Sequence, residues 1–253
     1  MFWLCAFAFL AGFVDSVVGG GGLIQLPALL LFLPPEQAAA VPAVLGTNKL
    51  SSICGTGMAL AQYARRIPIP WQSMLPAAVT AFVLSFLGAR TVSIVSPAIL
   101  KPLVLVLLVA VAICTFVQTN FGRLHAPRFT ARHEIWVGLL IGAVIGFYDG
   151  FFGPGTGSFL IFTFIGLLGF DFLTATASAK VINFATNLSA VGYFAATDRI
   201  LYAYAVPMGI CNLFGSILGA RMAIWKGNRF VRWFFLAVVS VLILRYGWDV
   251  IFP

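Results

Sequence analysis

Four charged residues lie inside long apolar runs, where they could do chemistry. Lys49 and Lys180 each lie about seven residues into such a run, and Asp15 and Asp149 each precede a glycine-rich break. If these runs are membrane helices, the two lysines lie about 10 Å below the membrane surface. An ionisable group at that depth costs several kcal/mol unless it reaches the surface, pairs or meets a counter-ion. The residues therefore predict either internal ion pairs or a buried ion-binding site.

Polar residues accompany both lysines at helical spacing. Asn183 and Asn187 follow Lys180 on one helical face, as Ser52 and Thr56 follow Lys49, and Asn48 lies beside that lysine. One interpretation is that each lysine only fastens helices together through an ion pair. A single ion pair needs no polar stripe beside it, so the stripes favour a hydrated path with a ligand site.

The glycine-rich breaks supply a second element of such a site. The first contains Gly20, Gly21 and Gly22, and the second contains Gly155, Thr156 and Gly157. A helix that restarts after such a break presents free N–H groups and its positive dipole end, which together bind anions. Close packing of small residues or a plain hinge is the alternative interpretation. Neither break continues into GK[ST], which argues against a Walker nucleotide loop.

The two aspartates lie about one helical turn before these breaks. We expect Asp15 and Asp149 either to compensate the lysine charges or to take up and release a proton during transport. The alternative is a structural acid that caps N–H groups of the loop. Arg90 and Arg221, in twin LGAR motifs, are expected to anchor helices at the membrane interface. A small oxyanion is the ligand that this donor-rich set predicts.

The composition defines the class of protein that must hold these residues. Hydrophobic residues make up 61% of the 253 residues and charged residues only 9%, whereas soluble domains carry about 25% charged residues. Repeated apolar runs near twenty residues then predict an all-α polytopic membrane protein in a lipid bilayer. The net charge of +8 comes from short connections between these runs, as the positive-inside rule expects, and does not predict nucleic-acid binding. No metal or cofactor is expected, since the histidines and cysteines form no recognisable motif. No segment resembles a cleavable signal peptide with a basic leader.

The chain consists of two similar halves. Lys49 and Lys180 are 131 residues apart, and the same spacing separates the two LGAR motifs. We therefore predict a first transmembrane repeat over 1–119, a basic cytoplasmic connector over 120–134 and a second repeat over 135–253.

Each half is predicted to form a re-entrant or interrupted helix pair followed by three transmembrane helices. The expected pairs are 1–18 with 23–33 and 135–152 with 158–169, because the shorter segments cannot cross a membrane alone. The expected long helices are 41–63, 72–94, 98–119, 174–196, 203–224 and 230–250.

Basic residues predict that the halves are inverted. With three crossings in each half, most arginines share one face with the connector, and the opposite face carries the acids Glu36, Asp171, Asp198 and Asp249. The positive-inside rule then favours inverted repeats with the amino terminus outside, over a parallel arrangement with four crossings in each half.

The motifs resemble those of the sulfite exporter TauE/SafE family of membrane transporters, particularly its YfcA-like members. The matching segments cover both halves: GFVDSVVGGGGLIQLPAL, LGTNKLSSICGT, GFYDGFFGPGTGSF, TATASAKVINFATN and both LGAR motifs. The resemblance implies export of sulfite, organosulfonates or related anions across the bacterial inner membrane. It also implies functional roles for Asn48, Lys49, Lys180, Asn183 and the two breaks.

The sequence thus predicts a secondary transporter of a small sulfur-containing anion that works by rocking one half against the other. A channel-like anion uniporter, an intramembrane enzyme and a non-transporting scaffold are the alternatives. For the enzyme, Ser158 follows a glycine loop, but no histidine lies at membrane depth to act as its base. We therefore expect no catalysis. The sequence leaves the oligomeric state open, and a homo-oligomer is compatible with it.

Overall fold

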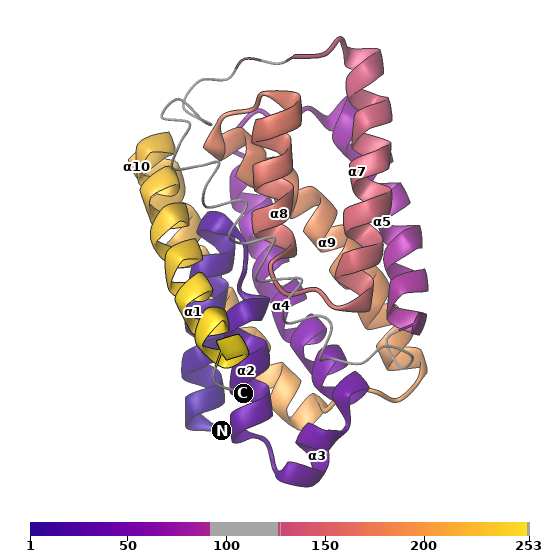
Figure 1. Cartoon of the computed structure of the whole chain (residues 1–253), viewed down its shortest axis with the longest axis vertical. Coiled ribbons are helices and arrows are strands. Elements are labelled where there is room, and N and C mark those ends of the chain that lie inside the picture. The colour runs from indigo at the N-terminus through magenta and orange to yellow at the C-terminus, as the bar shows by residue number, and fades with distance from the viewer. Residues whose placement is uncertain (92–125, 127, 252–253) are drawn as a thin grey trace.

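The computed structural model describes residues 1–91, 126 and 128–251, and their regular structure is helical throughout. The helices are α1 (Phe2–Val18), α2 (Gly22–Phe32), α3 (Pro35–Ala39), α4 (Val41–Ala64), α5 (Trp71–Thr91), α7 (Ala131–Phe151), α8 (Thr156–Thr163) with its π-helical continuation η1 (Phe164–Leu168), α9 (Phe172–Ala196) and α10 (Tyr202–Ile251). Figure 1 shows them as one bundle whose long helices run roughly side by side. The helix predicted near 98–119 lies outside the described residues.

The predicted helix pairs and long helices are otherwise confirmed, with ends within a few residues. The helices predicted over 203–224 and 230–250 form the two arms of α10, which are separated by a non-helical residue, Gly227, with φ of 75°. The short helix α3 was not predicted. It begins with Pro35, whose fixed φ suits the first turn of a helix.

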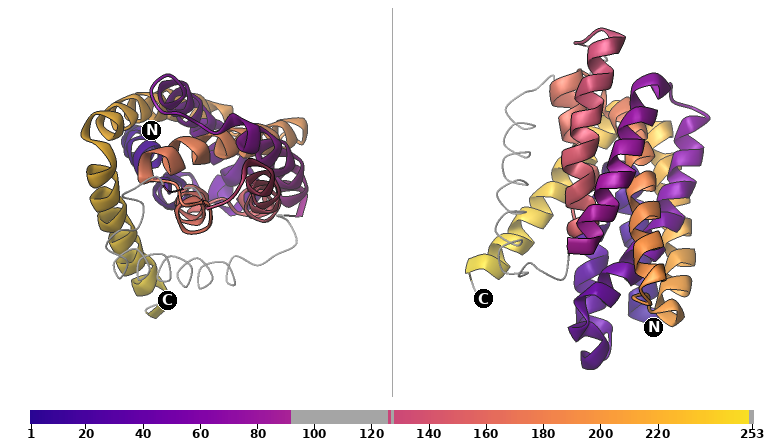
Figure 2. Two further views of the ribbon diagram at one scale, coloured as in Figure 1. Left: turned by 90° about the horizontal axis from the view of Figure 1, so that it is seen from above. Right: turned by 90° about the vertical axis from the view of Figure 1, so that its right-hand side faces the viewer.

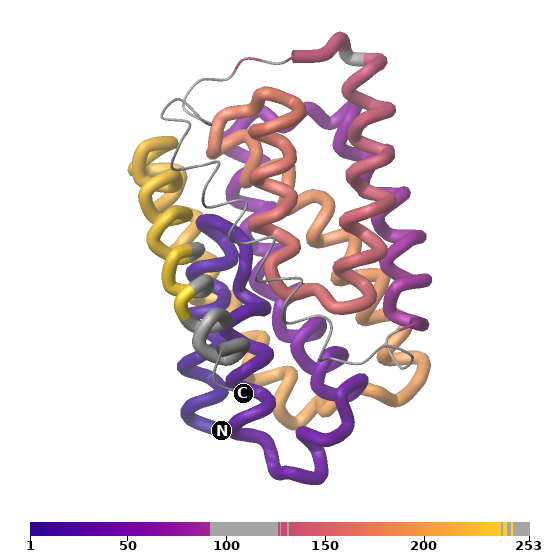
Figure 3. Tube along the Cα trace, viewed as in Figure 1, coloured from indigo at the N-terminus to yellow at the C-terminus, as the bar shows by residue number. Residues whose placement is uncertain are grey.

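Glycine ends the helices inside the bundle. Helix α1 stops at Gly19 and Gly20, with φ of 70° and 100°, and α8 starts after Gly155, with φ of 84°. Residues with a side chain adopt these left-handed angles only at a cost, so glycine supplies both breaks. The tube trace shows that both breaks lie within the bundle rather than at its ends (Figure 3).

Three helical segments in the described chain are long and apolar enough to cross a membrane. They are Trp71–Thr91 in α5, Arg132–Phe151 in α7 and Tyr202–Val238 in α10. Helices α4 and α9 have 24 and 25 residues, but each carries a lysine and a buried polar stripe. The described residues thus form an all-α architecture of apolar helices, as the composition predicts.

The two helix pairs enter the bundle from opposite ends. Helix α1 begins at one end of the molecule and α7 begins at the other (Figures 1 and 2). The N–H of Arg128 donates to the carbonyl of Leu168, so the segment before α7 lies beside the end of η1.

One residue was placed on the wrong face. Asp171 caps α9, its carboxylate accepting from the N–H of Thr174, immediately after η1. It therefore lies at the basic end, where α7 begins, and not opposite it.

The halves are intertwined rather than side by side. Helix α1 of the first half packs most extensively against α10 of the second half. Helix α5 of the first half packs most extensively against α7 of the second half, so one long helix of each half lies among helices of the other. The LGAR glycines make these contacts close: a Cβ on Gly88 would lie 2.2 Å from the carbonyl oxygen of Phe147, and one on Gly219 would lie 2.4 Å from that of Phe13. Small residues at such contacts let membrane helices approach closely.

Equivalent residues make equivalent bonds in the two resulting groups of helices. Ser85 Oγ donates to the carbonyl of Thr186, and Ser216 Oγ donates to the carbonyl of Gly55. We call α1, α2, α4 and residues 202–226 of α10 the first bundle, and α5, α7, α8 and α9 the second bundle. Helices α4 and α9 form the main contact between the two bundles.

Candidate functional site

The two glycine breaks touch each other inside the protein. A Cβ on Gly19 would lie only 2.3 Å from the carbonyl carbon of Gly157, and Gly22 lies against the backbone of Pro154. Real Cβ contacts are never this short, so the missing side chains are what let the two loops meet. The structure thus brings together two breaks that the sequence separates by more than a hundred residues.

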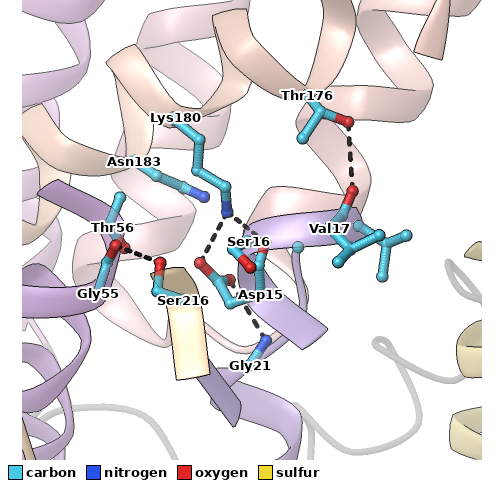
Figure 4. A network of polar contacts seen from close by, with 12 residues as sticks. Asp15, Ser16, Val17, Gly21, Gly55, Thr56, Thr176, Lys180, Asn183 and Ser216 are labelled. Carbon is cyan, nitrogen blue, oxygen red and sulfur yellow. Dashed lines mark hydrogen bonds and ion pairs between the residues drawn. The ribbon is translucent and has the colours of Figure 1, made fainter. Parts of the chain in front are cut away.

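Side chains from other helices satisfy the buried end of α1 (Figure 4). The last four carbonyls of a helix have no partner within it, and water cannot serve them inside a membrane. The carbonyls of Ser16, Val17, Val18 and Gly19 each accept from a side chain here: Tyr63 Oη at 2.8 Å, Thr176 Oγ1 at 3.4 Å, and Ser158 Oγ at 3.1 and 3.2 Å. Lys180 Nζ donates to the carbonyl of Asp15, which also accepts from the N–H of Gly19 at 2.9 Å. Three of these donors belong to the second half of the chain.

The second break relies on donors from its own segment. Tyr148 Oη donates to the carbonyl of Pro154 at 2.6 Å, and Thr156 Oγ1 donates to that of Gly153 at 2.7 Å. The two breaks are therefore similar in sequence but are held differently.

The lysines and aspartates form two ion pairs that cross between the halves. Lys49 Nζ lies 2.8 Å from Asp149 Oδ2, and Lys180 Nζ lies 2.7 Å from Asp15 Oδ2. Both lysines are buried, at 3% and 0% exposure. The interpretation of these residues as internal ion pairs therefore describes a real contact, and the charges of the four groups sum to zero.

Asp15 occupies the position that the sequence predicts for an anion. Its Oδ1 accepts from the N–H of Gly21 at 3.3 Å, at the start of α2, while Oδ2 meets the ammonium of Lys180. A helix start and a lysine thus bind one carboxylate, as expected from the helix dipole and the free N–H groups. The alternative role of Asp15 as a loop cap is likewise realised.

A polar cavity of about 30 Å³ lies beside these pairs. A single water needs about 10–15 Å³, so the cavity has room for about two waters or one anion of few heavy atoms. Most of the predicted site residues line it. The lining consists of Asp15, Gly20, Gly22, Asn48, Lys49, Ser52, Thr56, Asp149, Gly153, Gly155, Thr156, Gly157, Asn183 and Asn187.

Two predicted residues lie behind this lining rather than in it. Lys180 is fully buried against Asp15, and Gly21 faces the same carboxylate.

Thr56 and Gly153 line the cavity although they were not among the site residues predicted. Thr56 belongs to the polar stripe after Lys49, and Gly153 has φ of 92° in the second break. Both signals are visible in the sequence, as stripe spacing and as a glycine in the loop.

Unpaired polar atoms lie at this cavity. Asn48 is 4% exposed and its Oδ1 has no hydrogen bond, and Asp149 Oδ2 has none beyond its ion pair with Lys49. Unsatisfied buried polar atoms usually indicate an unseen partner, such as water or a ligand. Asn187 Nδ2 reaches Thr56 Oγ1 at 3.5 Å, so the two polar stripes meet between α4 and α9.

Other candidate residues lie outside the cavity. Arg90 and Arg221 are exposed. Ser158 Oγ is engaged with the carbonyls of Val18 and Gly19, so in this structure it is a structural donor. Among the described residues, no three His, Cys, Asp or Glu side chains are grouped so as to hold a metal ion.

Apolar helices around an ion-paired cavity, with two broken helices meeting there, are features of membrane transporters. The chain belongs to the family described as Sulfite exporter TauE/SafE, which it matches over residues 4–246.

Three relatives carry transporter names. The chain is 37% identical to a probable membrane transporter protein, ORF9, of a Sinorhizobium species, over 94% of this chain and 88% of that protein. It is 35% identical to a probable membrane transporter protein of Haemophilus influenzae, over 88% of this chain and 85% of the relative. It is 31% identical to the probable membrane transporter protein YfcA of Escherichia coli K12, over 96% and 87%. No solved structure matches the chain.

Proposed function

We propose that this membrane transporter is a secondary transporter that exports a small sulfur-containing anion, such as sulfite or an organosulfonate, across the bacterial inner membrane. The observation that carries the proposal is the cavity at the meeting point of the two breaks, which Lys49 lines together with Asn183, Asn187 and Thr156. Ammonium, amide and hydroxyl groups are donors that suit a compact oxyanion. The family description, which names a sulfite exporter, supports the same class of substrate.

Helix α8 adds backbone donors to this set. Within the described chain, the N–H groups of Gly157 and Ser158 at its start have no hydrogen-bond acceptor. Gly157 lines the cavity, so this helix start presents its positive end to a ligand there.

We further propose that the two halves are inverted repeats and that alternating access moves the two bundles. Helix pairs that enter from opposite ends support the inversion. Because each bundle contains a long helix from the other half, one half cannot rock as a unit against the other, as the sequence suggested. The first bundle would instead rock against the second, with α4 and α9 between them and the cavity at their contact.

A thermal-shift experiment on the purified protein tests the substrate class. Sulfite, thiosulfate and methanesulfonate should each be titrated, with acetate for comparison, and a true ligand should raise the unfolding temperature with the logarithm of its concentration. The Lys49→Ala variant should lose this stabilisation, whereas Lys226→Ala, which removes an exposed lysine, should keep it.

The outcome also separates the alternatives. A scaffold has no ligand, so no anion would stabilise the wild type. Equal stabilisation of wild type and Lys49→Ala would remove the lysine from the site. A channel-like uniporter would bind the anion but would show no coupling when its flux is measured in vesicles.

A further inference from the structure

We infer that the two ion pairs have different roles: the Lys49–Asp149 pair opens to admit the anion while Asp149 takes up one proton, and the Lys180–Asp15 pair stays closed. The transporter would then move one proton with each monovalent anion. This inference rests on the proposed function, and it adds the coupling ion and the group that binds it.

The contacts of the two carboxylates differ. Asp15 is held by two donors, the ammonium of Lys180 and the N–H of Gly21. Asp149 Oδ2 has a single partner, Lys49, and no hydrogen bond besides. An anion can therefore displace Asp149 from its lysine by breaking one contact, whereas displacing Asp15 breaks two.

The lysines differ in the same sense. Lys49 lines the cavity, and its Nζ lies close to Gly153 in the second break. Lys180 has no exposed surface, does not line the cavity and also donates to the backbone carbonyl of Asp15. This hydrogen bond holds Lys180 at the end of α1, and an anion cannot replace it because an anion has no proton to donate to the carbonyl.

The charge balance requires a second ion when the anion binds. Two lysines and two aspartates leave the empty site neutral, so a bound monoanion adds one uncompensated negative charge. A buried charge without a partner costs several kcal/mol. One proton on Asp149 restores neutrality: the O–H bond forms at the carboxylate that leaves Lys49, and the ammonium then pairs with the anion.

Few other groups could supply this compensation. The helices packed against α7 are α5, α8 and α9: α5 carries Arg90, α9 carries Lys180 and Tyr193, and α8 carries no charged or titratable residue. Helix α7 itself adds Tyr148 beside Asp149, with Arg132, His133 and Glu134 in its first turn, and Lys49 of α4 is the ion-pair partner. Asp15 lies across the cavity but keeps its own lysine. A metal cation would need more oxygen-rich surroundings than one free carboxylate. Asp149 is thus the group placed to bind a proton.

Reconstituted vesicles test the coupling. Methanesulfonate is the probe, because it stays a monoanion over the usable pH range and moves no proton by itself. Its uptake and the internal pH should be recorded together, with voltage clamped by potassium and valinomycin. We expect one proton per anion and no dependence on voltage or sodium. The apparent Kd should rise about tenfold per pH unit wherever Asp149 is ionised.

In the Asp149→Asn variant, anion transport should no longer be coupled to proton transport. Its site carries a net positive charge, so anion uptake should continue without proton movement, become voltage-dependent and lose the pH dependence of Kd. The matched Asp15→Asn variant removes the same charge but disrupts a carboxylate that is held by two donors, so its unfolding temperature should fall well below that of Asp149→Asn. For sulfite, which itself titrates, the relevant count is the difference in protons per anion between wild type and Asp149→Asn.

Failure of the inference and failure of the proposed function look different. Anion uptake without protons in the wild type, a requirement for sodium, or coupling lost in Asp15→Asn and kept in Asp149→Asn would overturn the inference and leave anion transport intact. No uptake of any of the tested anions would overturn the proposed function itself.

Discussion

At the scale of single residues, the two halves share a sequence pattern but not its chemistry. Tyr63 donates to the carbonyl of Ser16, whereas the equivalent position 131 residues later is Phe194, which has no hydroxyl and packs in the core. The lysines follow the same rule, since Lys49 lines the cavity and Lys180 lies behind it. The two halves thus contain equivalent positions, but the neighbouring residues give the two positions of each pair different contacts.

A substitution at the contact between the breaks should separate the two loops. In Gly157→Ala the new Cβ would lie 2.6 Å from Gly19 Cα and 3.0 Å from Asn183 Nδ2. Overpacking of this kind costs about 1–3 kcal/mol, so the unfolding temperature and anion binding should both fall. Gly192→Ala is the control: nothing lies within 4 Å of its Cβ, and alanine gains about 0.5–1 kcal/mol over glycine in a helix. Equal stability of the two variants would contradict the close contact.

The residues that line the cavity stand out in the sequence because each breaks a rule of membrane sequence. A lysine, an aspartate and a run of glycines are all costly inside an apolar helix, so their presence indicates a function. Their pairing could not be predicted, because Lys49 meets Asp149 and Lys180 meets Asp15 only through the tertiary arrangement. Spacing along one helix defines a face, but it does not identify the helix opposite.

At the scale of elements, the end of α1 shows what allows a helix to stop inside a membrane. Glycines predict where the helix ends, and the sequence shows this directly. The donors that make the end tolerable come from α4, α8 and α9, and nothing in the local sequence of α1 points to them. Three of the four side-chain donors come from α8 and α9, so these bonds connect this hairpin to the second bundle as well as to the first, while the second break has only local bonds.

Removal of one donor should therefore destabilise the protein. Tyr63→Phe leaves the buried carbonyl of Ser16 without a side-chain donor, which costs about 1–3 kcal/mol. Tyr193→Phe is the matched control, because in the described structure the hydroxyl of Tyr193 makes no hydrogen bond. A lower unfolding temperature in Tyr63→Phe alone is expected. The same loss in both variants would mean that the aromatic rings, and not the hydroxyl, carry the effect.

At the scale of the whole molecule, the charges distinguish the two ends. Arg65 and Arg66 follow α4, Arg128 precedes α7, and Lys226 and Arg229 flank the turn of α10. The side chain of Asn228 at that turn accepts from the N–H of Leu173, so these basic segments lie at one end. By the positive-inside rule, we predict that this end faces the cytoplasm.

Cysteine labelling in intact cells checks this orientation. In a background whose four cysteines are replaced, Ala64→Cys and Ala196→Cys form a matched pair, each being the exposed last residue of its helix, α4 or α9. A membrane-impermeant maleimide should label Ala196→Cys from outside and Ala64→Cys only after permeabilisation. Labelling of both from outside would contradict the opposed ends, and the reverse pattern would invert the topology.

The exchange of helices between the halves constrains how the chain is made. Helix α1 leaves the ribosome well before α8 and α9, yet the hydroxyls of Ser158 and Thr176 and the ammonium of Lys180, which donate to carbonyls at its end, belong to those later helices. Until then the newly made hairpin would expose bare carbonyls to lipid, so the translocon cannot release it as a finished unit. We therefore expect α1 to reach its final packing only after α8 and α9 are made, and we expect neither half to assemble when synthesised alone.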